Sequence, residues 1–560
     1  MGWIKSVVAG AWASASLILL ANPAIAANTP QVGPVPTWVR PPPATPIEKD
    51  DLKGLPVVIL FHDAQLSFDA DGWTEYHEVT ARVQTPEGLQ ALNTISYQWS
   101  PWSDTLTFHR AVISRDGQTI DILPKDGAFT VLRRETGLEQ AMLTGELTTL
   151  LQPEGLQVGD TLDVAISIHH ADPLLKGRSA ALFANWDTTS VGQMRLQAHW
   201  PSSLPVKWRE TPGLPPLRRT EAGGVTTVEL DMDDVRPPIL PAHAPVRFRR
   251  GRQVEFTTFS DWKAVAQVMA PLYAKGAELG PQSAVAAQAA LIAKTSADPK
   301  QRAAAALRLV QGHVRYLAHA EDGGGLMPQS ADETWRLRYG DCKAKTVLLM
   351  ALLRELGVPA EPVLASVGGG DGLNAYLPAP QLFNHVLVRV RLGGRDYWLD
   401  GTREGDRNLD DLATPAFGWV LPLDSPDGQL VRLEASPASR PQVSEIIRYD
   451  ASGRAADPKP TRLETTFRDD VAGALHAKLS AIPPERMEAA LKAYWTTAHT
   501  AFTPAHVAQA WDPDTRELKL TADGTSKIDW SDAGFELQNV EVRGAPDVKR
   551  DPAASDPDAP

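Results

Sequence analysis

The stretch that decides the fold is Arg338-Tyr339-Gly340-Asp341-Cys342-Lys343, which holds the only cysteine of the 560-residue chain. The residues that follow, 346–353, are apolar nearly all round and predict a buried helix. Asp341 is a favourable N-cap residue, and Gly357 marks the expected helix end. Cys342 therefore falls at about the first helical position. There, unpaired backbone N–H groups and the helix dipole favour a thiolate and can hold an oxyanion.

A strand pattern downstream supplies the partners that a reactive cysteine needs. Residues 384–392 alternate like a strand, and Gly393-Gly394 predicts a tight turn before a return strand. With a two-residue loop, His385 and Asp400 fall on one face as diagonal neighbours within hydrogen-bond reach. A three-residue loop would shift the register by one and move Asp400 to the opposite face, so the inference depends on the turn.

A cysteine at a helix start, followed by a histidine and an aspartate on adjacent strands, provides a nucleophile, a base and an orienting carboxylate. At these residues the sequence resembles the transglutaminase-like superfamily, which shares its core with papain-type thiol enzymes. The matching segments are 339–343, 384–386 and 398–402. Segments 314–316 and 323–328 are similar to the bacterial exported branch, which carries an N-terminal domain of unknown function 3857. Ala344 departs from that branch, which more often has Asp there.

The resemblance implies that Cys342, His385 and Asp400 form a catalytic triad in this chain order. Two further residues are candidates for oxyanion or substrate binding. Asp341 adjoins the cysteine, and Tyr316 either donates to an oxyanion or packs beneath the helix.

Length and composition limit the classes of protein that remain. A chain of 560 residues predicts three to four domains. The formal net charge of −13 argues against a nucleic-acid partner, because phosphate binding needs a basic face. Sixteen tryptophans suit carbohydrate stacking, but filling of β-sandwich cores is the favoured explanation.

The N-terminus predicts export. A charged start, an apolar run over 7–20 and the Ala24-Ile25-Ala26 motif are typical of a signal peptide over residues 1–26. No later stretch is long and apolar enough to span a bilayer. We therefore expect a periplasmic protein, and its single cysteine leaves no disulfide framework.

The chain as a whole reads as a multidomain α+β protein. We expect a central transglutaminase-like core, an N-terminal antiparallel β-sandwich and a C-terminal β-rich domain. The predicted parts are a signal peptide at 1–26, a Pro-rich linker at 27–56, the sandwich at 57–250, the core at 251–425, the C-terminal domain at 426–546 and a disordered tail at 547–560.

No metal site or cofactor is predicted. His169 and His170 are adjacent on a predicted strand, point to opposite faces and have no further ligand set. The glycine run 368–370 lacks the Lys-Ser/Thr and helix of a phosphate loop. The long loop 368–380 before the histidine strand is either a mobile lid or substrate-binding wall, or an inert surface insertion.

The leading hypothesis is an exported thiol enzyme that cleaves or transfers amide bonds of a peptide or protein substrate, with hydrolysis favoured. The alternative is a non-catalytic cell-envelope protein that binds a partner or a glycan and merely retains the fold. A redox sensor is disfavoured because Cys342 has no resolving cysteine in the chain. The substrate, the acceptor and the oligomeric state do not follow from the sequence.

Overall fold

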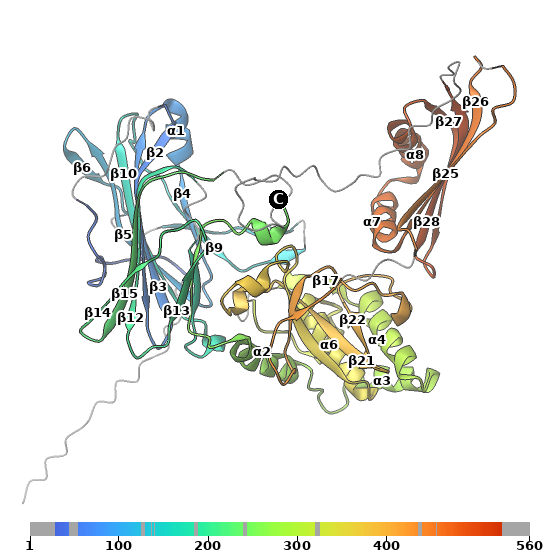
Figure 1. Ribbon diagram of the computed structural model, residues 1–560, viewed down its shortest axis with the longest axis horizontal. Coiled ribbons are helices and arrows are strands. Elements are labelled where there is room, and N and C mark those ends of the chain that lie inside the picture. Colours follow the sequence, from blue (N-terminus) through green and yellow to red (C-terminus); the bar gives the residue numbers. More distant parts are fainter. Residues whose placement is uncertain are drawn as a thin grey trace, which may run out of the picture.

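The computed structural model describes residues 28–43, 54–124, 129–135, 137–138, 141–183, 189–238, 244–319, 325–434, 440–454 and 456–528. The predicted signal peptide and disordered tail lie outside the described residues. Figure 1 shows three parts along the chain: an N-terminal β-rich part, a central part of helices around a sheet, and a C-terminal sheet with two helices. This multidomain α+β architecture confirms the predicted fold class.

The N-terminal part is built on one large sheet. Its order is β1-β5-β10-β3-β2-β12-β15-β14, with β6 beside β5, and two three-stranded sheets, β11-β16-β13 and β4-β9-β7, accompany it. Apolar side chains fill the space between the large sheet and each small one. Two pairs, β1 with β5 and β12 with β2, are parallel, so the large sheet is mixed. The elements are β1 (Gln31–Val32), β2 (Val57–Phe68), β3 (Trp73–Val83), α1 (Pro86–Leu92), β4 (Ile95–Trp99), β5 (Asp104–Arg115), β6 (Gln118–Asp121), β7 (Thr130–Arg133), β8 (Met142–Leu143), β9 (Leu147–Leu151), β10 (Thr161–His170), η3 (Pro173–Leu175), β11 (Ala180–Phe183), β12 (Val191–Pro201), β13 (Lys207–Glu210), β14 (Arg218–Ala222), β15 (Val225–Val235), η5 (Val246–Phe248) and β16 (Val254–Thr257).

Part of the Pro-rich segment contacts this sheet: β1 pairs with β5, and residues 40 and 41 bond to β2 and β12. Arg195 on β12 is buried, pairs with Asp63 and donates to the backbone carbonyls of Arg40 (2.8 Å) and Pro41 (3.0 Å). Arg40 and Pro41 lie outside any helix or strand, so their carbonyls are free to accept from a side chain. A buried guanidinium needs such acceptors, and the segment supplies them.

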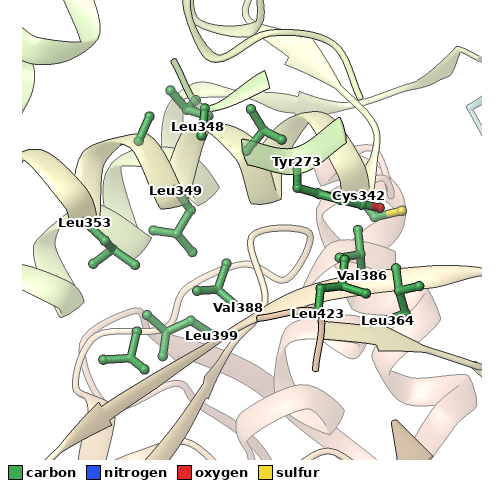
Figure 2. Close-up of a cluster of buried hydrophobic side chains, with 14 of the residues drawn as sticks. Tyr273, Cys342, Leu348, Leu349, Leu353, Leu364, Val386, Val388, Leu399 and Leu423 are labelled. Carbon is green, nitrogen blue, oxygen red and sulfur yellow. The ribbon is translucent and has the colours of Figure 1, made fainter. Parts of the chain in front are cut away.

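The central part contains a five-stranded antiparallel sheet of order β22-β21-β20-β23-β24, against which α6 packs. Helices α2, α3, α4 and α5 contribute to the same buried cluster as α6, part of which is drawn in Figure 2. The elements are α2 (Trp262–Gly276), α3 (Ala284–Thr295), α4 (Pro299–His313), β17 (Arg315–Tyr316), β18 (Ala318–His319), α5 (Ala331–Leu337), β19 (Tyr339–Gly340), α6 (Cys342–Glu355), β20 (Ala360–Ala365), η6 (Leu373–Ala375), η7 (Pro380–Leu382), β21 (His385–Leu392), β22 (Arg395–Leu399), η8 (Leu409–Asp411), β23 (Trp419–Pro422) and β24 (Val431–Arg432).

Helix α6 begins and ends as its sequence predicts. The Asp341 carboxylate accepts from the backbone N–H of Ala344 at 2.8 Å, which is an N-cap. At the other end Gly357 has φ +69°, and the N–H of Val358 donates to the carbonyl of Leu353 at 2.9 Å. That 6→1 bond is the Schellman ending, which needs a left-handed residue and so favours glycine.

The hairpin β21–β22 has the register that a two-residue turn requires. Leu392 pairs with Arg395, and Val388 pairs with Leu399. Gly393 and Gly394 both have positive φ, as the tight turn demands. The predicted turn length is therefore confirmed.

The C-terminal part is a four-stranded antiparallel sheet of order β25-β26-β28-β27 with two helices packed on it. Trp495 on α8 is fully buried in its core. The elements are β25 (Val443–Tyr449), β26 (Lys459–Arg468), α7 (Asp469–Ser480), α8 (Pro484–Ala498), β27 (Phe502–Asp512) and β28 (Glu517–Ser526). Across the parts of the chain that the structure describes, no helix could span a membrane.

Candidate active site

Cys342 occupies the first position of α6 and is 7% exposed. Its position follows from the cap, because the bond from Ala344 N–H to Asp341 fixes where the helix begins. Lys343 pairs with the Asp341 carboxylate, so the charges that flank the cysteine neutralise each other. The backbone N–H of a first helical residue has no partner inside its helix, which leaves it available to a substrate oxygen.

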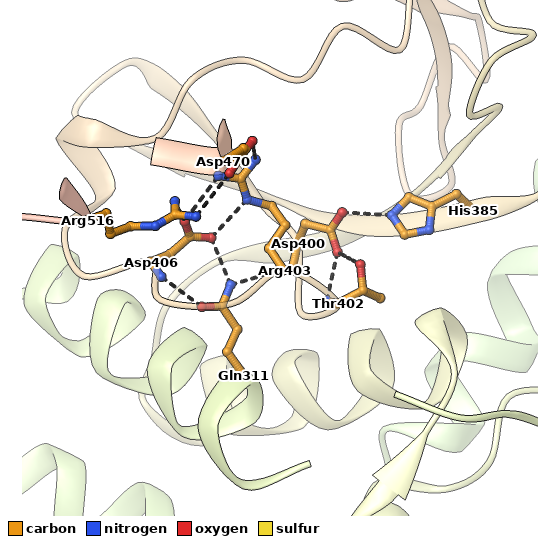
Figure 3. A network of polar contacts seen from close by, with 8 residues as sticks. All are labelled: Gln311, His385, Asp400, Thr402, Arg403, Asp406, Asp470 and Arg516. Atoms are coloured by element: carbon orange, nitrogen blue, oxygen red, sulfur yellow. Dashed lines mark hydrogen bonds and ion pairs between the residues drawn. The ribbon is translucent and has the colours of Figure 1, made fainter. Parts of the chain in front are cut away.

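His385 and Asp400 meet across the hairpin end, as Figure 3 shows. The Nε2 atom of His385 lies 2.8 Å from Oδ2 of Asp400. The other carboxylate oxygen of Asp400 accepts from the backbone N–H of Thr402 at 2.8 Å and from its hydroxyl at 2.6 Å. Asp400 is therefore fixed on both sides, and the Nδ1 atom of His385 remains for the Cys342 thiol.

The electrostatics of this pair keep the imidazole charged. Burial alone would lower the pKa of His385, but hydrogen bonds to Asp400 and Cys342 outweigh burial and raise it to about 10. Burial alone would raise the pKa of Asp400, but its hydrogen bonds to His385 and Thr402 and the histidine charge lower it. At neutral pH the pair is an imidazolium and a carboxylate, and an imidazolium beside a cysteine favours the thiolate.

A pocket of about 90 Å³ contains both Cys342 and His385. Its lining presents both polar and apolar groups; the remaining lining residues are Met269, Tyr273, Gly325, Leu326, Lys343, Leu364, Pro380, Phe383, Asn384 and Val386. Figure 2 shows the Cys342 sulfur beside Val386 and Leu364 at the end of the buried cluster. Thr346 on α6 donates to the carbonyl of Val386 at 3.2 Å and so ties the cysteine helix to the histidine strand.

A second pocket, of about 220 Å³, lies on the other side of the helix start. Asp341 and Ala344 line it together with Leu317 and Met327. An aspartate at position 344 would place a carboxylate in this lining. With alanine at this position, the second pocket has one carboxylate fewer than it would have with aspartate.

The two secondary candidates have different positions. Tyr316 pairs with Gly340 in the β17–β19 ladder and is 39% exposed, so it does not pack beneath the helix. Burial and the nearby Cys342 and Asp341 raise the pKa of its hydroxyl to about 12, which keeps it a proton donor at neutral pH. The Asp341 carboxylate is occupied by the cap and by Lys343, and its charge would repel an oxyanion. Its position therefore argues against an oxyanion-binding role.

A polar network behind Asp400 was not foreseen. The Gln311 side-chain amide donates to the Asp400 carbonyl (2.9 Å) and to the Asp406 carboxylate (2.8 Å), and Asp406 N–H donates back to Gln311 (3.0 Å). Asp406 also accepts from Arg403 (3.1 Å) and from Arg516 of the C-terminal part (2.9 Å), as drawn in Figure 3. Gln311 lies on the Ala- and Leu-rich buried face of α4. A polar residue on such a face indicates a buried hydrogen-bond partner, and the sequence could have revealed the network in this way.

Arg516→Ala is expected to loosen the C-terminal part from the core. The Asp406 side chain is only 2% exposed, and the substitution removes one of its cationic partners, at a cost of about 1–3 kcal/mol in the free energy of unfolding. Faster release of a C-terminal fragment in limited proteolysis checks this. The matched control is Arg407→Ala. Arg407 makes only a long contact of 4.0 Å with the exposed Asp514, so its loss should change the rate of proteolysis little. Equal protection of Arg516→Ala and wild type would contradict the expectation.

The histidine pair on β10 is bound within the sheet. His170 contacts Asp104 at 2.9 Å and Glu75 at 3.2 Å, and His169 contacts the Thr74 hydroxyl at 3.0 Å. Within the described ranges, no group of three or more histidine, cysteine or acidic residues is arranged to hold a metal ion.

The fold and the site together define the core as a papain-like α+β unit with a cysteine at a helix start and a histidine on the facing sheet. Residues 286–401 match the transglutaminase-like superfamily, and residues 69–239 match the domain of unknown function DUF3857. The two matches confirm the resemblance drawn from the sequence. No curated protein matches the chain.

Solved structures extend the likeness to most of the chain. A putative protease from Parabacteroides distasonis aligns with a TM-score of 0.54 at 12% identity, over 84% of this chain and 93% of its own. At that identity the likeness shows a shared fold. A putative cysteine protease from Cytophaga hutchinsonii (TM-score 0.17, 14% identity, 40% and 72% of the chains) and an M1 zinc metallopeptidase from Deinococcus radiodurans (0.21, 11%, 36% and 42%) are too distant to support an argument.

Proposed function

We propose that this protein is an exported thiol hydrolase that cleaves amide bonds of a peptide or protein substrate, with Cys342, His385 and Asp400 as its triad. The observation that carries the proposal is the 2.8 Å contact between His385 and Asp400 beside a pocket that holds Cys342. Export to the periplasm rests on the signal-peptide pattern of residues 1–26.

The first half of the reaction forms a thioester. The Cys342 sulfur attacks the substrate carbonyl carbon, and the Cys342 N–H stabilises the resulting oxyanion, with the Tyr316 hydroxyl as a candidate second donor. The carbon–nitrogen bond then breaks, and the imidazolium of His385 gives its proton to the leaving amine. Asp400 holds the imidazole in the required orientation and stabilises its positive charge.

The second half releases the acyl group. A water molecule attacks the thioester and gives a proton to His385, and the carbon–sulfur bond breaks to restore the Cys342 thiolate and leave a carboxylic acid. A primary amine in place of water would give a transamidated product.

A peptide library with and without a primary amine tests this proposal. Wild type is expected to yield peptide fragments, and Cys342→Ala is expected to lower their rate of formation by at least about 10³-fold. Amine-tagged peptides would identify a transglutaminase instead. Fragments formed equally by the two proteins would contradict the proposal. No product from a folded wild type would favour the alternative, a cell-envelope binding protein that retains the fold.

A further inference from the structure

One wall of the Cys342 pocket belongs to the long loop before β21. Residues 371–384, here called the wall, place Pro380, Phe383 and Asn384 in the lining of that pocket. Asn384 is fixed at its end of the wall, because its side-chain oxygen accepts from the N–H of Val367 at 2.7 Å. The shape of the pocket therefore depends on what holds the wall in place.

Polar contacts from the N-terminal part hold the middle of the wall. Glu255 on β16 is buried, and its carboxylate accepts from the backbone N–H of Leu377. The neighbouring Thr257 donates from its hydroxyl to the carbonyl of Pro378 at 2.8 Å. Arg209 donates to the carbonyl of Ala375 and pairs with Glu255 at 3.0 Å.

Glu255 also positions a second arginine against the wall. Arg250 pairs with its carboxylate and lies 4.0 Å over the ring of Tyr376. The buried Glu255 carboxylate therefore accepts one hydrogen bond from the wall directly. It also pairs with two arginines, and each of these contacts the wall. Loss of the Glu255 charge weakens all three contacts at once.

The wall is not packed from behind along its whole length. Beside these bonds an open cavity of about 120 Å³ lies between the wall and the strands β11 and β16, with Leu182 and Phe256 on the sheet side and Leu377 and Leu382 on the wall side. The η7 turn lies between this cavity and the pocket, since Leu382 lines the one and Phe383 the other. Leu373 and Phe383 anchor the wall in the central cluster, whereas beside this cavity its position depends on the polar contacts to β16.

We propose that Glu255 is a positioning residue through which the N-terminal part sets the width of the Cys342 pocket, and hence the size of the substrate side chain that the pocket accepts. The inference rests on the proposed function, because it treats this pocket as the substrate site. When the Glu255 contacts weaken, the wall is released from β16 and moves toward Cys342, and the pocket narrows. The sheet β11-β16-β13 of the N-terminal part thereby acts as a specificity element for the core.

Alkylation of Cys342 by two reagents of different size measures the width directly and needs no substrate. The readout is the ratio of the rate with N-benzyl iodoacetamide to the rate with iodoacetamide. Glu255→Gln keeps the side-chain volume and removes the charge, and Thr257→Val removes only the bond to Pro378. Each substitution is expected to lower the ratio by roughly fivefold, the factor that corresponds to one lost hydrogen bond.

Two further variants distinguish a change in pocket width from a general loss of order in the wall. Arg247→Ala removes an exposed ion pair to Asp371 at the start of the wall and should leave the ratio unchanged. Ala181→Leu adds volume to the cavity behind the wall, pushes the wall toward Cys342 and should therefore also lower the ratio. An unchanged or raised ratio in both folded Glu255→Gln and Thr257→Val would overturn the inference. A lowered ratio in a protein without turnover would support the positioning role while the proposed catalysis fails.

Discussion

Alkylation of Cys342 by iodoacetamide at pH 6 is expected to slow by roughly 100-fold when His385 is replaced by alanine. An ordinary thiol ionises near pH 8.5, so only a small fraction is reactive at pH 6. In the wild type the imidazole of His385, with a pKa raised to about 10, is positively charged at pH 6 and favours the thiolate. The pH dependence of the alkylation rate, measured in both proteins, checks this expectation.

The control for this experiment is His313→Ala. His313 lies at the end of α4, where its Nδ1 contacts the Leu309 carbonyl at 3.2 Å, away from the residues that line the Cys342 pocket. Its replacement should leave the alkylation profile as in the wild type. If His385→Ala reacts as fast as wild type at pH 6, Cys342 is a structural residue and the enzyme hypothesis fails.

Asp400→Asn is expected to lower turnover by about 10²- to 10⁴-fold, because it removes the charge that stabilises the imidazolium. The substitution keeps the size of the side chain, so Thr402 can still donate to the remaining carbonyl oxygen. A drop in kcat with little change in KM would identify Asp400 as acting on the chemical step. Unchanged kcat would contradict its proposed role.

The same substitution has a pH-dependent effect on stability. The pKa of His385 is raised from 6.5 to about 10, so its contribution is complete below pH 6.5 and is lost as the pH rises through about 10. The pKa of Asp400 is lowered from 3.8, so its contribution is complete above pH 3.8 and is lost as the pH falls through the lowered value. The difference in Tm between wild type and Asp400→Asn should therefore be largest from pH 3.8 to 6.5 and narrow toward pH 10.

The local parts of the site were predictable because short-range rules fix them. An aspartate cap and a run of apolar residues place Cys342 at a helix start, and Gly393-Gly394 fixes the register that brings His385 to Asp400. Both inferences need only neighbouring residues and known turn geometry. The catalytic roles of these residues stay predictions.

The long-range parts could not be predicted from patterns. The contacts of Arg195 with the Pro-rich segment and of Arg516 with Asp406 join residues more than 100 positions apart in the chain. Periodicity describes which face of an element is apolar, but it does not specify which distant surface covers that face. The loop 368–380 remained undecided for the same reason, since its anchor, Glu255, belongs to another part of the chain.

The burial of α6 has a consequence for amide hydrogen exchange. Ten of its residues are buried between the sheet and the surrounding helices, so its interior amides can exchange only when the whole core unfolds. The wall has a cavity behind it and is held by a few polar contacts, so its amides should exchange through small local openings. The Cys342 sulfur is thus carried by the element that we expect to exchange slowest, while the wall can adjust without disturbing it.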